Sequence, residues 1–287
     1  MKTYIELIKP RLSATVIFSS FAGYLLASTE QDYLLLSKLL IGGLFLVGAS
    51  NGLNQVYEVN TDALMTRTKN RPLPTKRISI TSALIFSLIL GFSGLLLLFS
   101  INITCGFFGA LSSFIYVLGY TPLKTSTPIS GFIGAFPGAM PFMLGYVAVT
   151  NQFNLEAVIL FAIQFLWQFP HFWSIAWIRY DDYNKANIKL LPSGEKDHKS
   201  ALQIVFYTFW LLPVSISPIL LNYFDIKPAF NLSIFGSFVI FLLGLIFLIQ
   251  SMILFKTMSN DDAKKLMIWS LIYLPFLQII YIIDKFV

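Results

Sequence analysis

Residues 36–57 read LSKLLIGGLFLVGASNGLNQVY and contain one charged side chain, that of Lys38. A helix of this length can cross the hydrocarbon core of a bilayer, which takes about 20 mostly apolar residues. Similar stretches recur along all 287 residues, of which 56% are hydrophobic and 12% charged, whereas a soluble domain carries about a quarter charged residues. The composition argues against a water-soluble enzyme or a disordered chain and predicts an all-α, polytopic membrane protein.

We expect one integral-membrane domain over residues 1–287, built as a bundle of nine membrane-spanning helices. The first span follows Lys9-Pro10-Arg11 and lacks a small-residue cleavage site, so we expect it to be retained rather than removed as a signal peptide. The predicted spans are residues 12–28, 36–57, 80–100, 103–120, 130–149, 156–178, 202–222, 230–255 and 266–284.

The basic side chains indicate how this bundle lies in the membrane. With a cytoplasmic N-terminus, 17 of the 20 lysines and arginines fall on the cytoplasmic side, as the positive-inside rule requires. An odd number of spans then places the C-terminus outside. The two long connections, residues 58–79 and 179–201, are polar and lie on the cytoplasmic side, so we expect the active face there.

Acidic and amide side chains gather where the second span meets the first long connection. Asn54, Glu58 and Asp62 are four residues apart, and on a helix they fall within one arc of about 80° that also holds Asn51. Two carboxylates at this spacing repel each other, and charge beside hydrocarbon is costly. A divalent cation removes both penalties, and all-oxygen ligands that share substrate phosphates suit Mg²⁺. A solvated helix end is the alternative.

Basic side chains follow this acidic face directly, at Arg67, Lys69 and Arg71. The planar guanidinium of arginine matches phosphate oxygens, so metal and arginines together describe a diphosphate site. We therefore expect catalytic roles for Asn54, Glu58, Asp62, Arg67 and Arg71, with Lys69 and Lys124 as further substrate contacts.

The second long connection carries a weaker acidic pair, Asp181 and Asp182, flanked by Arg179 and Tyr183. Alone, such a pair is usually a solvated turn. Opposite the first cluster it could supply further metal ligands, so Asp182 joins the predicted metal set of Asn54, Glu58 and Asp62. Arg179 and Tyr183 are predicted substrate contacts.

His171 lies inside the sixth span, directly after Pro170. A proline in a span frees a carbonyl one turn back, and ionisable side chains inside a membrane are functional candidates. The histidine points to a second substrate deeper in the bundle, and neutral imidazole is also a haem-iron ligand. A structural hydrogen bond to a neighbouring helix is the alternative. We expect His198 to be solvated and Cys105 to be a buried, inert thiol.

The pattern Asn54-x3-Glu58-x3-Asp62-x2-Met65-x-Arg67-Thr68-x2-Arg71 resembles the signature of the intramembrane, UbiA-type prenyltransferase superfamily. Further stretches resemble the branch of that superfamily that farnesylates protohaem IX. These are IKPR (8–11), ALMTRTKNRPLP (63–74), GYTPLKTSTP (119–128), GAFPGAMP (134–141), WQFPHFW (167–173) and DDYNKANIKLLP (181–192). Ser130 and Phe142 depart from this branch, where Asn and a second Pro are expected, and Glu58 stands where Asp is also common.

The resemblance implies a helical bundle around a central cavity open to the membrane, in the cytoplasmic membrane of a bacterium. It implies transfer of farnesyl from farnesyl diphosphate to a vinyl group of protohaem IX, with water adding as hydroxyl to give haem O. Mg²⁺ is then the cofactor, haem a substrate, and His171 positions the porphyrin. Farnesyl diphosphate, protohaem IX and the bilayer are the implied partners, with haem A synthase or oxidase assembly factors as candidates and no nucleic acid.

Two other functions remain open. The same chemistry could act on an aromatic acid or a quinone precursor. A transporter with an intramembrane ion site is the alternative of another class, although such sites lie at broken helices near mid-membrane, whereas the acidic residues here lie at span ends.

Overall fold

The computed structural model describes residues 2–226, 228–230 and 232–286, and each regular element in this part of the chain is a helix. The helices are α1 (Lys2–Ile8), α2 (Pro10–Ala27), α3 (Tyr33–Tyr57), α4 (Val59–Leu64), α5 (Ile80–Phe99), α6 (Ile103–Phe114), η1 (Ile115–Tyr120), α7 (Thr121–Leu123), α8 (Ser130–Thr150), α9 (Leu155–Ile178), α10 (Tyr180–Lys185), α11 (His198–Ser215), α12 (Ser217–Asn222), α13 (Ile234–Thr257) and α14 (Asn260–Phe286). The predicted all-α fold class is confirmed.

Seven helical stretches in the described residues are long and apolar enough to cross a membrane. They are α3, α5, α6 with η1 and α7, α8, α9, α13 and α14. The predicted spans at residues 12–28 and 202–222 correspond to α2 and to α11 with α12, which are not among the seven, so the count of nine is not confirmed. Residue 231 of the predicted eighth span lies outside the described residues.

Polar caps explain where the long helices begin. Asp32, Asn102, Asn154 and Ser233 each accept a backbone N–H of the first turn of α3, α6, α9 and α13, respectively, which satisfies donors that the helix itself leaves unpaired. The predicted seventh span is broken instead, because Ile216 leaves the helical conformation and α12 begins at Ser217, with Pro218 in its first turn.

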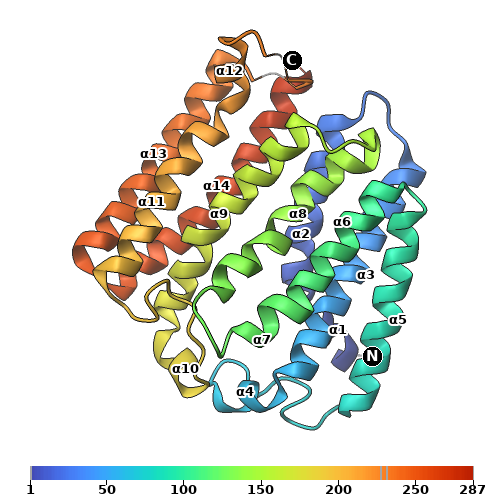
Figure 1. Ribbon diagram of the computed structural model, residues 1–287, viewed down its shortest axis with the longest axis vertical. Helices are drawn as coiled ribbons and strands as arrows, with labels where there is room; N and C mark the ends of the chain where they lie inside the picture. The colour runs from blue at the N-terminus through green and yellow to red at the C-terminus, as the bar shows by residue number, and fades with distance from the viewer. Residues whose placement is uncertain (1, 227, 231, 287) are drawn as a thin grey trace.

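The long helices lie side by side (Figure 1), and four of them, α2, α8, α9 and α14, contact one another in a closed circuit. α2 packs against α3 and α8, α8 against α9, and α14 contacts both α9 and α2. The α2–α8 contact depends on two glycines: a Cβ on Gly23 would overlap the carbonyl oxygen of Phe142, and one on Gly145 that of Ser20. Small residues of this kind let membrane helices approach closely.

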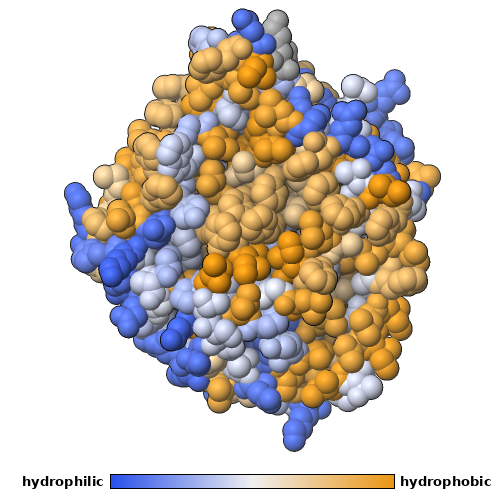
Figure 2. All heavy atoms as spheres, in the orientation of Figure 1, coloured by the Kyte–Doolittle hydropathy of each residue, from blue (hydrophilic) through white to orange (hydrophobic). Residues whose placement is uncertain are grey.

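The two ends of the bundle differ. α1, α4, α7 and α10 gather at the end that holds the N-terminus, and the C-terminus lies at the opposite end (Figure 1); we call the first the α4–α10 end. The surface between the ends is largely apolar, with hydrophilic residues concentrated towards them (Figure 2). Such a surface suits a protein that crosses a bilayer. Cys105 is buried in the hydrophobic core, as predicted.

Candidate active site

Asn54, Glu58 and Asp62 share one buried face although the helix that carries them is interrupted. Glu58, between α3 and α4, leaves the helical conformation with φ −91° and ψ 13°. The i to i+4 hydrogen bonds nevertheless continue, from Glu58 N to Asn54 O at 2.9 Å and from Asp62 N to Glu58 O at 2.7 Å. The three residues are 2%, 8% and 0% exposed, respectively. They therefore face the interior of the protein and not lipid.

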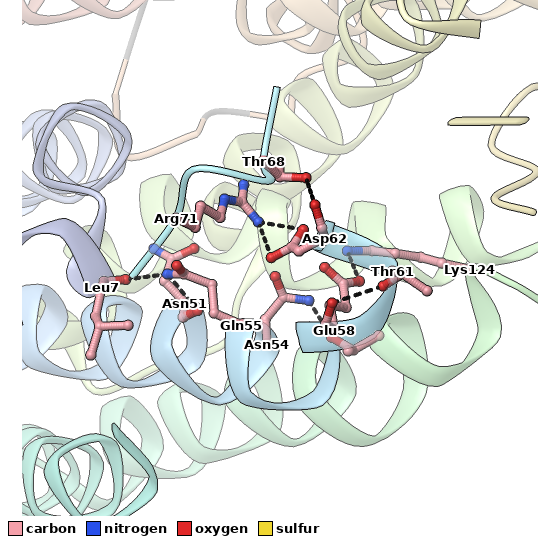
Figure 3. Close-up of polar contacts among 11 residues, drawn as sticks. Leu7, Asn51, Asn54, Gln55, Glu58, Thr61, Asp62, Thr68, Arg71 and Lys124 are labelled. Atoms are coloured by element: carbon pink, nitrogen blue, oxygen red, sulfur yellow. Dashed lines mark hydrogen bonds and ion pairs between the residues drawn. The ribbon is translucent and has the colours of Figure 1, made fainter. Parts of the chain in front are cut away.

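Each carboxylate of this face forms an ion pair with a base from another segment (Figure 3). Arg71 Nη1 lies 2.7 Å from Asp62 Oδ2, and Lys124 Nζ lies 2.7 Å from Glu58 Oε1. Burial alone would lower the pKa of Lys124, but the Glu58 carboxylate raises it above its ordinary value. The site therefore holds paired charges of both signs where the sequence predicted acids and bases.

A π-helix brings two tyrosines to this site that the sequence did not single out. Thr121 Oγ1 donates to the carbonyl of Tyr116 at 2.8 Å and accepts from Asn54 Nδ2 at 3.2 Å, so η1 is tied to α3. The Tyr120 ring lies under Lys124, with Nζ 4.3 Å from its centroid. π-Helical turns are frequent at functional sites, but no sequence pattern marks this one.

The C-terminal end of α1 is held against α3 by side chains of the same face. Gln55 Nε2 donates to Leu7 O at 2.8 Å, and Asn51 Nδ2 donates to Ile8 O at 3.5 Å. The next residue, Lys9, adopts a left-handed conformation with φ 48°, which is uncommon for a residue other than glycine. The polar face of α3 thus fixes the position of Lys9.

Lys9 is a further cation of the site. Its pKa is lowered to about 7, chiefly by burial and also by the charges of Arg71 and Lys124. Glu58 and Asp62 act in the opposite direction. The lysine is therefore close enough to the two ion pairs to respond to all four charges. In the sequence, Lys9 was marked only by the IKPR stretch (8–11), which resembles the family but for which no functional role was predicted.

Asp182 links the second long connection to the first. The sequence predicted that the two connections lie on the same side of the membrane. Its oxygens accept the backbone N–H groups of Thr66 at 2.8 Å and Arg67 at 3.2 Å, and Lys185 Nζ lies 3.1 Å from Oδ1. Partial desolvation raises the pKa of Asp182, but these hydrogen bonds hold it well below its ordinary value. The carboxylate organises the turn after α4, and its predicted role as a metal ligand stays a prediction.

The remaining predicted contacts lie nearer the surface of the α4–α10 end. Arg67 and Arg179 line one surface pocket together with Asp181 and Asp182, while Lys69 is exposed. Tyr183 packs on a small buried cluster that contains Met65. His198, at the start of α11, is exposed, as expected.

His171 lies apart from the acidic face, within α9. Its Nδ1 atom is 2.8 Å from Ser270 Oγ of α14, and its ring stacks on Trp167 with centroids 4.5 Å apart. The hydrogen bond to a neighbouring helix, which we considered as the structural alternative, is therefore present.

The two departures from the family pattern have different surroundings. Phe142 N donates to Gln164 Oε1 at 3.1 Å, a hydrogen bond that a proline could not form. Gln168 Nε2 donates to Gly138 O at 3.0 Å, so two glutamines of α9 brace α8 beside Pro141. Ser130 is fully buried, and its hydroxyl has no hydrogen-bond partner within the described residues.

The donor set fits a magnesium ion that shares its coordination with a ligand. Asn54, Glu58 and Asp62 offer oxygen atoms only, which Mg²⁺ prefers. Within residues 2–226, 228–230 and 232–286, no three His, Cys, Asp or Glu side chains form a group that could hold a metal. An ion at this face would therefore depend on an amide oxygen, water and substrate phosphates for its remaining ligands.

Comparisons with known proteins agree with this geometry. The pattern of the UbiA prenyltransferase family matches residues 16–272. The chain is 47% identical over 287 residues to the protoheme IX farnesyltransferase of Christiangramia forsetii, covering 100% of this chain and 94% of that protein. It is 48% identical over 284 residues to the protein of the same name from Flavobacterium johnsoniae, with 98% and 93% covered.

Solved structures share the fold. A digeranylgeranylglyceryl phosphate synthase structure superposes with a TM-score of 0.80 at 23% identity, covering 99% of this chain and 98% of the other. A UbiA homologue from Archaeoglobus fulgidus bound to GPP and Mg²⁺ superposes with a TM-score of 0.68 at 15% identity, covering 97% and 99%.

Proposed function

The chain belongs to the UbiA prenyltransferase family, and from this premise we propose that it transfers farnesyl from farnesyl diphosphate to a vinyl group of protohaem IX, giving haem O. The observation that carries the proposal is the identity of 47% over the full chain to a protoheme IX farnesyltransferase. The buried face of acids and bases is consistent with it, because a diphosphate needs a metal and cations together.

Asn54, Glu58 and Asp62 are the proposed metal-binding residues of a Mg²⁺-dependent reaction. When bound, the ion would neutralise diphosphate charge and favour departure of the leaving group. Binding of the ion by Glu58 and Asp62 would weaken their ion pairs with Lys124 and Arg71. The two bases would then interact more strongly with phosphate oxygens. The four side chains would exchange partners within the site, so binding leaves no buried charge unpaired.

Transfer begins with cleavage of the bond between farnesyl C1 and its diphosphate oxygen, which keeps the electron pair. Arg71 and Lys124, with Arg67, Lys69 and Lys9 around them, stabilise the negative charge that grows on this oxygen. The vinyl π bond supplies two electrons to C1 of the allylic cation. Water then adds to the other vinyl carbon and loses a proton, so the product carries a hydroxyl group.

The second substrate would lie deeper in the bundle, where His171 is the proposed porphyrin contact. Arg179 and Tyr183, at the α4–α10 end, are proposed substrate contacts. The protein would reside in the bacterial cytoplasmic membrane with this end in the cytoplasm, and haem A synthase or oxidase assembly factors stay predicted protein partners. One membrane domain around a cavity open to lipid is the proposed organisation.

Mass analysis of haem in cells tests the proposed function. Cells that express the chain should accumulate haem O, whereas cells with an empty vector or with Asp62→Ala should retain protohaem. A prenylated phenol or quinone precursor in place of haem O would assign the chain to another acceptor. If the expressing cells gave neither haem O nor any other prenylated product, the proposed function would be wrong.

A further inference from the structure

Two aromatic side chains of α9 are fixed by one residue of α14. Trp167 Nε1 donates to the backbone carbonyl of Ser270 at 2.7 Å, and the ring of His171, one turn later, contacts the Ser270 hydroxyl at 2.8 Å. The two rings are stacked with an interplanar angle of 13°. Ser270 is fully buried. The imidazole is thus held in one orientation by a stacking partner and by a hydroxyl group.

The hydrogen bonds of Ser270 determine which nitrogen of His171 carries the proton. Ser270 Oγ also lies 2.6 Å from the carbonyl oxygen of Met267, to which it donates. A serine hydroxyl has a single hydrogen, and this contact uses it. Oγ must therefore accept the hydrogen bond from the imidazole, so Nδ1 carries the hydrogen. In the neutral ring, Nε2 is then the unprotonated nitrogen.

The Nε2 atom is left without a protein partner. It forms no hydrogen bond with any residue in 2–226, 228–230 or 232–286, and the ring is only partly buried. The nitrogen is not fully buried, so a ligand can reach it. A histidine with a purely structural role would gain from pairing both nitrogens. The free lone pair of Nε2 points instead to a ligand from outside the chain.

We propose that Ser270 is a positioning residue that holds His171 as the Nδ1–H tautomer, so that Nε2 ligates the iron of protohaem. The inference rests on the proposed function, which makes protohaem a substrate. Neutral imidazole is a common haem ligand, and a hydrogen bond on its other nitrogen fixes the tautomer and raises its basicity. Carboxylates or carbonyls usually accept that bond; here a hydroxyl does so, itself fixed by Met267.

The test is a titration of the purified full-length protein with protohaem alone, followed by absorption spectroscopy. His171→Ala should abolish the spectrum of the histidine-ligated haem. Ser270→Ala should weaken protohaem affinity by about 10- to 100-fold, the usual cost of removing such a supporting hydrogen bond. Ser270→Thr retains the hydroxyl and should restore the wild-type spectrum and most of the affinity.

The matched control is Ser174→Ala. Ser174 Oγ donates to the backbone carbonyl of His171 at 2.8 Å, so this hydroxyl contacts the same residue without contacting its ring. Its removal should leave affinity and spectrum unchanged. Equal losses in Ser174→Ala and Ser270→Ala, wild-type affinity in Ser270→Ala, or a wild-type spectrum in His171→Ala would overturn the proposal.

Farnesyl diphosphate binding and haem O formation separate this inference from the proposed function. Ser270→Ala should bind farnesyl diphosphate as the wild type does, which also shows that the variant is folded. A wild-type protein that binds protohaem through His171 but forms no haem O would contradict the proposed function and leave the role of Ser270 intact. A wild-type protein that forms haem O without a histidine-ligated spectrum would contradict the role of Ser270 and leave the proposed function intact.

Discussion

Arg71 contacts both carboxylate oxygens of Asp62 through one nitrogen, Nη1, at 2.8 Å and 2.7 Å. Its Nε and Nη2 atoms form no hydrogen bond in the part of the chain that the structure describes, although a guanidinium offers five N–H donors. Asp62 therefore orients Arg71 while most of its donors remain available. This is the arrangement expected of an arginine that awaits phosphate oxygens.

Arg71→Lys should lower haem O formation on the order of 100-fold, the usual cost of losing one donor to a developing oxyanion. Lysine keeps the charge but not the planar fork, so charge alone should not suffice. The rate of haem O formation in membranes measures the effect. The matched control is Arg77→Lys, because Arg77 forms a two-point pair with the half-buried Glu6 at 3.1 and 2.8 Å, away from the acidic face. Similar losses in both variants would mean that Arg71 has no special role.

The Glu58–Lys124 pair should show strong coupling in stability and in activity. Lys124→Met leaves the Glu58 carboxylate buried without a partner, which costs about 3–5 kcal/mol. Glu58→Gln in the same chain removes that charge and should restore most of the stability. Unfolding in detergent measures all four members of the cycle. Haem O should be absent from the double variant, since both groups are proposed to act on the diphosphate, and an active double variant would contradict this.

Asp182→Asn distinguishes a role in the turn from a role at the metal. The structure places its oxygens on the amides of Thr66 and Arg67, so we expect a lower rate and lower thermal stability at an unchanged Mg²⁺ requirement. The Mg²⁺ concentration for half-maximal haem O formation is the quantity to measure. Asp181→Asn, at the neighbouring exposed carboxylate, should behave as wild type. A clearly raised Mg²⁺ requirement in Asp182→Asn would show instead that this residue ligates the metal.

Lys9 should make diphosphate binding dependent on pH. Its pKa of about 7 lies below the ordinary 10.5, so the free site loses this charge as the pH rises through 7. A bound anion favours the charged form, and binding near pH 8 should therefore take up a proton. By the same linkage, the cost of burying charged Lys9 reduces stability fully below about pH 7 and fades between pH 7 and 10.5.

Calorimetry of inorganic diphosphate binding, in buffers of different ionisation enthalpy, measures this proton uptake. Lys9→Arg keeps its charge throughout and should remove the uptake and much of the fall in affinity above pH 7. The exposed Lys2 of α1 provides the control, since Lys2→Arg should leave both unchanged. Proton uptake in Lys9→Arg equal to that of the wild type would exclude Lys9 from the site.

Local sequence signals accounted for the helices and for the acidic face. Apolar runs located the long helices, and the spacing of Asn54, Glu58 and Asp62 placed them on one side because consecutive turns repeat every 3.6 residues. The break at Glu58 was not predicted, yet the face survives it because hydrogen bonds continue across the break.

Partners distant in sequence could not be predicted. The predicted topology placed Lys124 and Asp182 on the same side of the membrane as Glu58. It did not indicate that Lys124 would contact Glu58 and Asp182 two backbone amides. The bond between His171 and Ser270 joins residues 99 positions apart. Such contacts depend on how α9 and α14 pack, and a single sequence does not contain that information.

The most direct measurement mixes the purified protein with farnesyl diphosphate, protohaem and Mg²⁺ and follows haem O and released diphosphate together. The wild-type protein should form the two products in equal amounts, and both should disappear when Mg²⁺ is chelated or when Asp62 is replaced by alanine. Haem O formed at an undiminished rate by Asp62→Ala would contradict the central claim that this buried acidic face drives farnesyl transfer.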